Sequence, residues 1–251
     1  MKQTHISGVV ITLNEEANIQ QCILSMSEVC DEIIIIDSRS IDRTEEICTS
    51  FDKVKFITQD WLGYSATKNE GATLTSNNFI LSLDADERLD AQAINAINIL
   101  KTVGLTSSYS FNRKNYYGDK WVKHGGWYPD KKIRLYNKVT CKWEGDYVHE
   151  TLQCAEDVTV HLKGNIEHYT ISSKSQHLQT IHKYAKLAAQ RDKKNGKSHT
   201  LFSTVLSCSS HFLKKYVIKL GFLDGELGFE IAWQSAKSKW LRYKYAKSSQ
   251  R

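Results

Sequence analysis

The chain has 251 residues, of which 41% are hydrophobic, which is enough for one main globular domain with a real core and an appendage. No stretch reaches the roughly 18 to 20 apolar residues of a transmembrane helix, and the N-terminus lacks a basic segment before an apolar signal core, so we expect a cytoplasmic protein. The net charge of +6 is unevenly divided, because residues 171–251 carry 16 Lys and Arg against 4 Asp and Glu, whereas residues 1–170 carry 18 against 24.

The first hundred residues alternate between apolar runs and segments of helical periodicity. Strands are expected at residues 5–13, 33–36, 53–60 and 79–87. Helices are expected at residues 19–26, from Asp42 or Thr44 onward, and at 64–76 and 91–103. Residues 33–36 are apolar at every position, as in a parallel strand covered on both faces. The alternation predicts a doubly wound, mostly parallel α/β sheet with helices on both faces, which binds its ligand beyond the carboxyl ends of the strands.

Polar side chains follow three of these strands. They are Asn14, Glu15 and Glu16 after the first strand, Asp37, Ser38 and Asp42 after the second, and Asp84 and Asp86 after the fourth. Any one of them can simply form a turn or cap a helix. Their recurrence at three strand ends favours a binding site.

The acidic cluster in "LDADERLD" needs an explanation, because Asp84, Asp86 and Glu87 repel one another. A shared cation would remove that repulsion. Carboxylate oxygens suit Mg²⁺ or Mn²⁺, and such ions take their remaining ligands from phosphates and water. The cluster therefore indicates a metal site for a nucleoside diphosphate, although an isolated D-x-D pattern also arises by chance.

The alternation stops after residue 105, and the next segment is rich in Trp, Tyr and Gly, as in loops and antiparallel strands. Residues 174–194 suit an amphipathic helix, and the segment after it mixes Leu, Phe, Trp and Tyr with Lys at helical intervals. Such helices pack on the main domain or lie in an anionic membrane interface, where we expect Phe212, Tyr216, Phe222, Trp233 and Trp240 as anchors. We expect a catalytic domain at residues 1–170 and a helical basic region at 171–251.

The six cysteines contain no C-x-x-C pair. Their scatter argues against a disulfide framework and against a structural zinc site. We therefore expect ordinary reduced thiols.

A set of motifs in this order resembles the inverting family 2 glycosyltransferases of the GT-A fold. The motifs cover roughly residues 5–152 and are "VVITLNEEANIQQCILS", "IIIIDSRSIDRTEEI", "YSATKNEGA", "LSLDADE", "HGGWYPDKKIRLY" and "GDYVHETL". The closing "LGFLDGELGFEIAWQSAKSKWLRYKYAK" is similar to the tail of bacterial lipopolysaccharide inner-core glucosyltransferases. The resemblance implies transfer of a hexose, in the first place glucose from UDP-glucose, to a core heptose on the inner face of the bacterial inner membrane.

The resemblance also implies which residues bind the donor and the metal. Leu13, Asn14 and Glu15 would face the nucleotide base, Asp37 would bind uracil or ribose, and Asp42 would support that loop. Lys68 would lie near the donor pocket, with Asp84 and Ala85 at the nucleotide. The metal, Mg²⁺ or Mn²⁺, would be held by Asp86, with Asp84 and His149 completing its shell. Arg39 stands where relatives commonly have Gly, which leaves the loop conformation open.

An inverting transfer needs a base for the acceptor hydroxyl. The resemblance favours Glu150, with Asp130 as the second choice. Trp127, Tyr128 and Arg134 would line a lipid-linked oligosaccharide acceptor. Glu150 and Asp130 could instead cap a helix or pair with Arg134, and the sugar and the oligomeric state stay open.

Three alternatives remain at this point. Another cell-surface glycan could be the acceptor. A nucleotidyltransferase would share the sheet and the metal, but it needs a Gly-rich basic loop where this chain has the acidic "LNEEAN". A nucleic-acid-binding module would use the basic tail, but the acidic front domain would repel the same backbone, and we expect no nucleic-acid partner.

Overall fold

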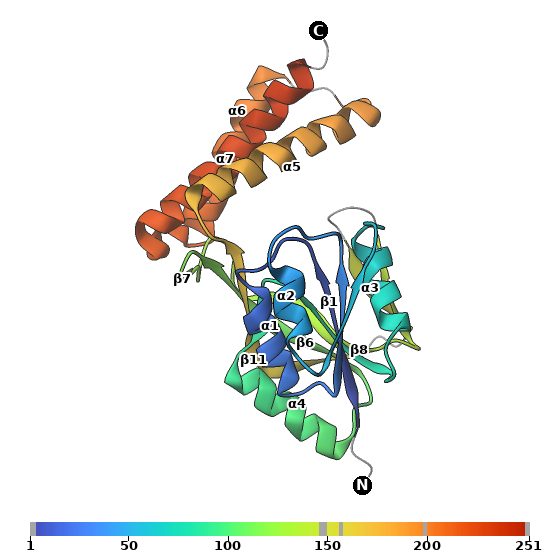
Figure 1. The fold of residues 1–251 in the computed structure, drawn as a ribbon. Coiled ribbons are helices and arrows are strands. Elements are labelled where there is room, and N and C mark those ends of the chain that lie inside the picture. Colours follow the sequence, from blue (N-terminus) through green and yellow to red (C-terminus); the bar gives the residue numbers. More distant parts are fainter. Residues whose placement is uncertain (1–3, 146–149, 156–157, 198–199, 249–251) are drawn as a thin grey trace. The chain divides into compact units, whose positions relative to one another are not determined.

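The computed structural model describes residues 4–145, 150–155, 158–197 and 200–248 (Figure 1). The chain divides into two compact units, the first formed by Met1–Arg113 and Lys131–His168 and the second by Lys114–Asp130 and Tyr169–Arg251. The division into residues 1–170 and 171–251 stays a prediction, and the compact units group residues 114–130 with the C-terminal part of the chain.

The first unit begins with the predicted alternation of strands and helices. The elements are β1 (Ile6–Thr12), α1 (Ile19–Ser27), β2 (Glu32–Asp37), α2 (Thr44–Thr49), β3 (Val54–Thr58), α3 (Tyr64–Thr73), β4 (Phe79–Asp84), β5 (Glu87–Leu89) and α4 (Ala91–Val103). Strands β2 and β4 both pair in parallel with β1, and β3 pairs in parallel with β2. The predicted α/β fold is thereby confirmed.

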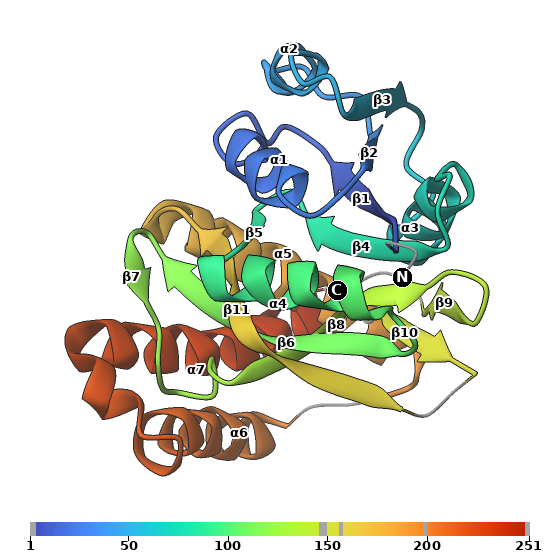
Figure 2. The ribbon, with the colours of Figure 1, turned by 90° about the horizontal axis from the view of Figure 1, so that it is seen from below.

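Helices cover both faces of this parallel sheet (Figure 2). On one face, Val10 of β1 belongs to a buried cluster that includes Ile19 and Ile23 of α1. On the other face, α3 approaches so closely that a Cβ on Gly71 would lie 2.6 Å from a methyl carbon of Val9. Alternate residues of β1 are therefore buried against different helices, which explains why its sequence is apolar on both sides.

The strands after α4 extend the sheet and make it mixed. They are β6 (Ser108–Tyr117), β7 (Lys120–Trp121), β8 (Asp130–Asn137), β9 (Cys141–Glu144), β10 (Thr151–Cys154) and β11 (Thr159–Ile171). The large sheet has the order β3-β2-β1-β4-β8-β6-β11-β5, and β7 pairs with β6. Because β8 is antiparallel to β4, the parallel part of the sheet ends at β4, beside the acidic cluster.

The expectation of reduced thiols is wrong for two of the six cysteines. Cys141 of β9 and Cys154 of β10 form a disulfide. The two strands form an antiparallel hairpin whose register places these residues directly opposite each other, with Cα atoms 4.0 Å apart. Spacing along the chain did not reveal this pair, because the hairpin alone brings it together. Cys22, Cys30, Cys48 and Cys208 are free thiols, as expected.

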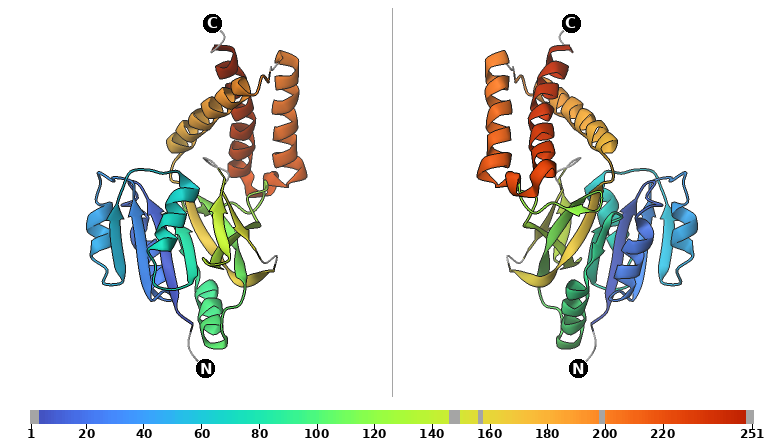
Figure 3. Two further views of the ribbon diagram at one scale, coloured as in Figure 1. Left: turned by 90° about the vertical axis from the view of Figure 1, so that its right-hand side faces the viewer. Right: turned by 90° about the vertical axis from the view of Figure 1, so that its left-hand side faces the viewer.

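The second unit is mainly helical. Its helices are α5 (Lys174–Lys194), α6 (Leu201–Leu213), the π-helical turn η1 (Lys214–Ile218), the 3-10 turn η2 (Gly221–Asp224) and α7 (Gly225–Ser248). Helix α7 lies between α5 and α6 and packs against both (Figure 3). Among the described residues, none of the helices combines the length and the apolar content that crossing a membrane requires.

Candidate functional site

The candidate site lies where β1, β2 and β4 end. Because β1 pairs with both neighbours, its last residues are in register with both acidic strand ends. Thr12 is opposite Asp37 of β2, and Ile11 is opposite Asp84 of β4. The structure thus brings the polar strand ends of the sequence to one edge of the sheet, where open α/β sheets bind ligands.

The acidic cluster at the end of β4 is paired with cations of the protein itself. Arg134 of β8 donates from Nη2 to Asp84 Oδ2 at 2.7 Å and to Glu87 Oε1 at 2.6 Å. Glu87 Oε1 also accepts from Arg113 Nη1 at 2.9 Å, and Asp84 Oδ1 lies 2.8 Å from Lys68 Nζ. Side chains from β6, β8 and α3 therefore offset much of the repulsion that the sequence pattern implies.

Lys68 connects this cluster to Glu150. It is only 1% exposed, and its Nζ lies 3.5 Å from Glu150 Oε1. The same ammonium group lies 4.6 Å from the ring centroid of Trp143, which favours a cation at that place. Lys68 is therefore not a solvated lysine on the outer face of its helix. Lys68, Asp84 and Glu150 are brought together as one charged group.

The cations change the ionisation of Asp84 and Glu87. Burial alone would raise the pKa of Asp84, but the charges of Arg134 and Lys68 outweigh burial and hold it well below its usual range. Glu87 is fully buried, which would raise its pKa, yet Arg134 and Arg113 lower it in spite of the nearby Asp84 charge. Both groups are therefore carboxylates at neutral pH.

Asp86 differs from Glu87 in being partly exposed, and it differs from Asp84, which is 28% exposed, in its partner. Its side chain is 23% exposed, and its Oδ2 lies 3.2 Å from Nε2 of His168 on β11. Among the residues that the structure describes, no three His, Cys, Asp or Glu side chains converge as a metal site. The predicted ligand His149 lies outside the described residues. Because both oxygens of Asp84 already face Lys68 or Arg134 and Glu87 is buried, Asp86 is the carboxylate of the cluster that is best placed to meet a ligand.

The loops after β1 and β2 are tied together by hydrogen bonds. Asp37 is buried and accepts from the backbone N–H and the hydroxyl of Ser40. Ser40 Oγ in turn accepts from the N–H of Asn14 at 2.8 Å, and Asn14 Oδ1 accepts from the N–H of Ile41 at 2.9 Å. Asp42 accepts from the N–H groups of Thr44 and Glu16. The predicted nucleotide-facing residues therefore form one connected rim.

Two features of this rim bear on ligand binding. Leu13 is exposed. The partial burial of Glu15 raises the pKa of its carboxyl group, and the nearby charge of Asp86 raises it further. Arg39 has a φ of 66°, in the left-handed region that favours glycine. The loop therefore has at Arg39 a conformation that suits glycine, and the guanidinium pairs with exposed Asp60 at 2.6 Å.

The predicted acceptor residues Trp127 and Tyr128 belong to the second unit, as does Asp130. Asn115 donates from Nδ2 to the carbonyl of Trp127 at 2.8 Å, and the ring of Tyr128 stands edge-on to Trp121 at 5.1 Å. Arg134 belongs to the first unit and is buried between two carboxylates. Its part in acceptor binding stays a prediction, as do the roles of the other site residues.

Sequence reasoning missed the partners of the acidic cluster. Arg113 and His168 received no role, and Glu87 was noted only for its charge. His168 is in register with Glu87 across the β11–β5 pair, so only the pairing of distant strands reveals it. A weak signal existed for Arg113, because a charged residue in the middle of an aromatic strand needs a buried partner.

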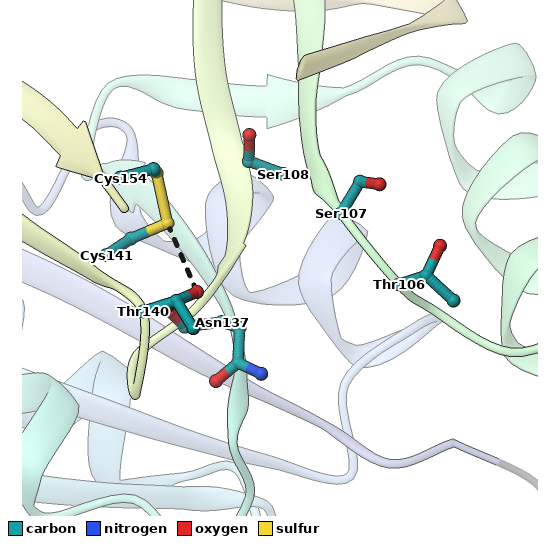
Figure 4. Close-up of a pocket in the computed structure, with 7 residues that line it drawn as sticks. All are labelled: Thr106, Ser107, Ser108, Asn137, Thr140, Cys141 and Cys154. Carbon is teal, nitrogen blue, oxygen red and sulfur yellow. Dashed lines mark hydrogen bonds between the residues drawn. A yellow bond between two sulfur atoms is a disulfide. The ribbon is translucent and has the colours of Figure 1, made fainter. Parts of the chain in front are cut away.

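A small cavity lies elsewhere in the first unit, beside the disulfide (Figure 4). It is lined by Thr106, Ser107, Ser108, Asn137, Thr140, Cys141 and Cys154. None of these residues belongs to the acidic cluster or to the nucleotide rim. We assign no function to this cavity.

The α/β sheet with helices on both faces and acidic strand ends agrees with the GT-A fold that the sequence resemblance implies. Residues 7–152 match the family described as glycosyl transferase family 2. Because the match spans more than half of the chain, the chain belongs to glycosyl transferase family 2. The predicted enzyme class is confirmed, and the nucleotidyltransferase and nucleic-acid-binding alternatives are set aside.

Individual relatives agree with this assignment. An uncharacterized glycosyltransferase of Rickettsia typhi is 30% identical over 250 residues, which cover 94% of this chain and 85% of the relative. The lipopolysaccharide core biosynthesis glycosyltransferase LpsC of Rhizobium meliloti is 25% identical over 255 residues, 95% of this chain and 93% of the relative. The mannosyltransferase PcManGT from Pyrobaculum calidifontis, solved with GDP-Man and Mn²⁺, is 9% identical with a TM-score of 0.52 over 99% of this chain and 88% of its own. This last likeness supports the fold alone.

Proposed function

We propose that the enzyme transfers glucose from UDP-glucose to a heptose of a lipopolysaccharide or lipooligosaccharide inner core, with inversion at the anomeric carbon. The observation that carries the proposal is the charge arrangement at the end of β4, where Asp84 is balanced by Lys68 and Arg134 while Asp86 stays accessible. The similarity to LpsC, a lipopolysaccharide core biosynthesis glycosyltransferase, supports the class of acceptor. Another cell-surface glycan is the alternative acceptor.

A divalent cation fits the residues at this edge. Mg²⁺ or Mn²⁺ needs only one or two protein carboxylates when phosphates complete its shell, and Asp86 supplies an accessible one. Asp84 is the weaker candidate, because each of its oxygens already faces a cation, and His149 remains a proposed ligand. A bound ion would offset the charge that grows on the leaving diphosphate.

The nucleotide would lie against the rim formed by the loops after β1 and β2. Leu13 and Asn14 present an exposed edge to the base, and Glu15 lies beside them. Asp37 already accepts two hydrogen bonds from Ser40, but a carboxylate has lone pairs for more, so it can also bind a ribose or uracil donor. Asp42 fixes the loop, and Ala85 leaves the backbone beside Asp84 and Asp86 without a bulky side chain.

The chemical step also needs a base, and Glu150 is our first choice. Its carboxylate lies beside Lys68, which also contacts Asp84, so it belongs to the same charged group as the metal-binding turn. As a base it would take the proton of the acceptor hydroxyl while the sugar leaves the diphosphate. Asp130 is the second choice. Trp127 and Tyr128 would offer aromatic faces to the acceptor sugar.

The second unit would hold the enzyme at an anionic membrane surface on the cytoplasmic side. Helix α6 turns apolar side chains to the solvent, namely Leu201, Phe202, Val205, Leu206 and Leu213, and Phe202 is 80% exposed. Its small polar residues Ser203, Thr204 and Ser207 instead line a cavity with Lys239 and Arg242 of α7. An apolar helix face turned outward in a basic unit is typical of interfacial binding. Two of the anchors expected from the sequence, Phe212 and Tyr216, stack on each other with ring centroids 5.3 Å apart, and their role at a membrane stays a prediction.

The test is transfer of labelled sugar to lipopolysaccharide that has been truncated to its inner-core heptoses. The donors are UDP-glucose, UDP-galactose and UDP-N-acetylglucosamine, each with Mg²⁺, with Mn²⁺ or with EDTA. We expect transfer from UDP-glucose that EDTA abolishes and that yields the inverted anomer. Transfer from another donor would change the identity of the proposed sugar. Transfer in excess chelator would show that the reaction needs no divalent metal.

Flotation with vesicles tests the membrane surface separately. Binding should appear with anionic vesicles and weaken as salt rises. Phe202→Ser/Leu206→Ser should reduce it while the enzyme still turns over a water-soluble core acceptor. Undiminished flotation of this variant would show that α6 is not the binding face.

A further inference from the structure

Asp224 of the second unit is bonded to His124, which lies a hundred residues earlier in the chain. Asp224 Oδ2 accepts from the backbone N–H of His124 at 2.8 Å, and Oδ1 lies 2.9 Å from Nδ1 of the imidazole. The Asp224 side chain is only 8% exposed. Both oxygens of one buried carboxylate are therefore used on a single residue.

This contact is one of several hydrogen bonds that hold residues 124–127 in place. The N–H of Gly125 donates to the carbonyl of Lys219 at 2.9 Å, and the N–H of Trp127 donates to the carbonyl of His124 at 3.1 Å. Gly125 and Gly126 have φ values of 65° and 81°, a conformation that side chains disfavour. The segment is thus a tight turn whose shape depends on partners outside it.

The partners themselves are packed closely. Gly221 begins the 3-10 turn η2 that ends at Asp224, and a Cβ on Gly228 of α7 would lie 1.8 Å from the carbonyl oxygen of Gly221. Only glycine allows η2 and α7 to approach in this way. Trp127 and Leu227 of α7 both pack against a buried cluster that includes Ile231 of α7. The glycines and the aspartate of "LGFLDGELGF" therefore form a rigid support for the turn.

We propose that Asp224 is a positioning residue for the acceptor site, acting through His124 on the turn that leads into Trp127, Tyr128 and Asp130. This proposal rests on the proposed function only in giving those three residues their roles. The carboxylate fixes the backbone and the ring of His124, and the turn is then held in one conformation. The motif after η1 would thereby serve acceptor binding as well as the packing of η2 against α7.

The variants compare removal of the carboxylate with its conservative replacement. Asp224→Ala removes both contacts. Asp224→Asn can keep them, because its amide oxygen can accept from the His124 N–H while its NH₂ donates to Nδ1 in the other tautomer. His124→Ala removes only the ring contact. Glu230→Ala is the matched control, because Glu230 is a carboxylate of the adjoining helix α7 whose contacts are with Lys174 and Gln234.

Hydrogen–deuterium exchange of the full chain tests the structural step without any substrate. We expect Asp224→Ala to speed exchange at Gly125 and Trp127, His124→Ala to do so less, and Asp224→Asn and Glu230→Ala to leave it unchanged. Residues 79–89 should exchange as in the wild type in all four. Unchanged exchange at residues 124–127 in both Asp224→Ala and His124→Ala would overturn the proposal.

Kinetics test the functional step. With UDP-glucose and inner-core lipopolysaccharide, Asp224→Ala should raise the acceptor KM by about tenfold or more, at the lower end of what hydrogen bonds to a charged group contribute. Hydrolysis of UDP-glucose without acceptor should persist, because the donor site is not altered, and Asp224→Asn should restore the KM. Faster exchange with an unchanged acceptor KM would show a merely structural pair and also overturn the proposal. Absence of wild-type transfer would instead refute the proposed function and leave the exchange result to decide on the turn.

Discussion

Replacing Arg134 with Met is the most informative perturbation of the charged cluster. The guanidinium is buried and meets Asp84 and Glu87 from one nitrogen, at 2.7 and 2.6 Å. After the change, Glu87 is still fully buried and keeps Arg113, and Asp84 keeps Lys68, so neither carboxylate is completely alone. Because removing one partner from a buried ion pair costs about 3–5 kcal/mol, we expect Arg134→Met to lower the free energy of unfolding by about 3 kcal/mol.

The loss of stability in Arg134→Met should depend on pH in a defined direction. The pKa values of Asp84 and Glu87 are lowered in the folded protein, chiefly by Arg134 acting against burial. A lowered folded pKa contributes stability that is fully present above the unfolded value, about 4, and that is lost as the pH falls through the folded value. The gap between wild type and Arg134→Met should therefore be largest at neutral pH and narrow as the pH falls below about 4.

The assay is urea unfolding, followed by circular dichroism at several pH values. Arg88→Met is the control, because Arg88 pairs with Glu167 at 2.9 Å but is a third exposed, and such a pair contributes at most about 1 kcal/mol. In Glu87→Gln/Arg134→Met, removal of both charges should recover part of the loss. Wild-type stability of Arg134→Met, together with a raised acceptor KM, would refute the structural account and support the predicted acceptor role of Arg134.

Three further changes test other parts of the structure. Glu150→Gln should lower kcat at least about a hundredfold with donor affinity nearly unchanged, as for a general base, and the same signature in Asp130→Asn instead would move the assignment. Cys141→Ser/Cys154→Ser should lower the free energy of unfolding by up to about 3 kcal/mol, the value for a loop of similar length, and reductant should destabilise the wild type but not this variant. Arg39→Gly should raise the midpoint of thermal unfolding slightly, because it relieves a positive φ at the loss of one exposed ion pair; a lowered midpoint would show that the Asp60 contact outweighs the backbone cost.

The parallel half of the fold follows from local patterns in the sequence. The fully apolar run at residues 33–36 lies in β2, and the periodic segments correspond to α1, α3 and α4, because burial on one or both faces leaves its period in the chain. The convergence of Asp37 and Asp84 also follows, since parallel strands end at the same edge. The pairing of strands that lie far apart in the sequence leaves no such periodic pattern. The guanidinium of Arg134, the imidazole of His168 and the Cys141–Cys154 bond therefore emerge only from the register of the antiparallel strands.

Helix α6 illustrates a second limit of prediction from the sequence. Its sequence is amphipathic, which identifies a helix but does not say which face is turned to the rest of the unit. In the structure the polar side, with Thr204 and Ser207, faces α7, and the apolar side with Phe202 faces solvent. The expectation of membrane anchors stays a prediction, and two of the expected anchors, Phe212 and Tyr216, stack on each other.

Calorimetric binding of UDP to wild type and to Asp86→Ala, each with Mn²⁺ and with EDTA, tests the central claim most directly. The claim is that the edge beyond β4 binds a nucleoside diphosphate through a cation held by Asp86. We expect the wild type to bind UDP with Mn²⁺ and much more weakly with EDTA, and Asp86→Ala, folded by circular dichroism, to bind equally weakly in both. Equal affinity of wild type and variant in the presence of Mn²⁺ would contradict the claim.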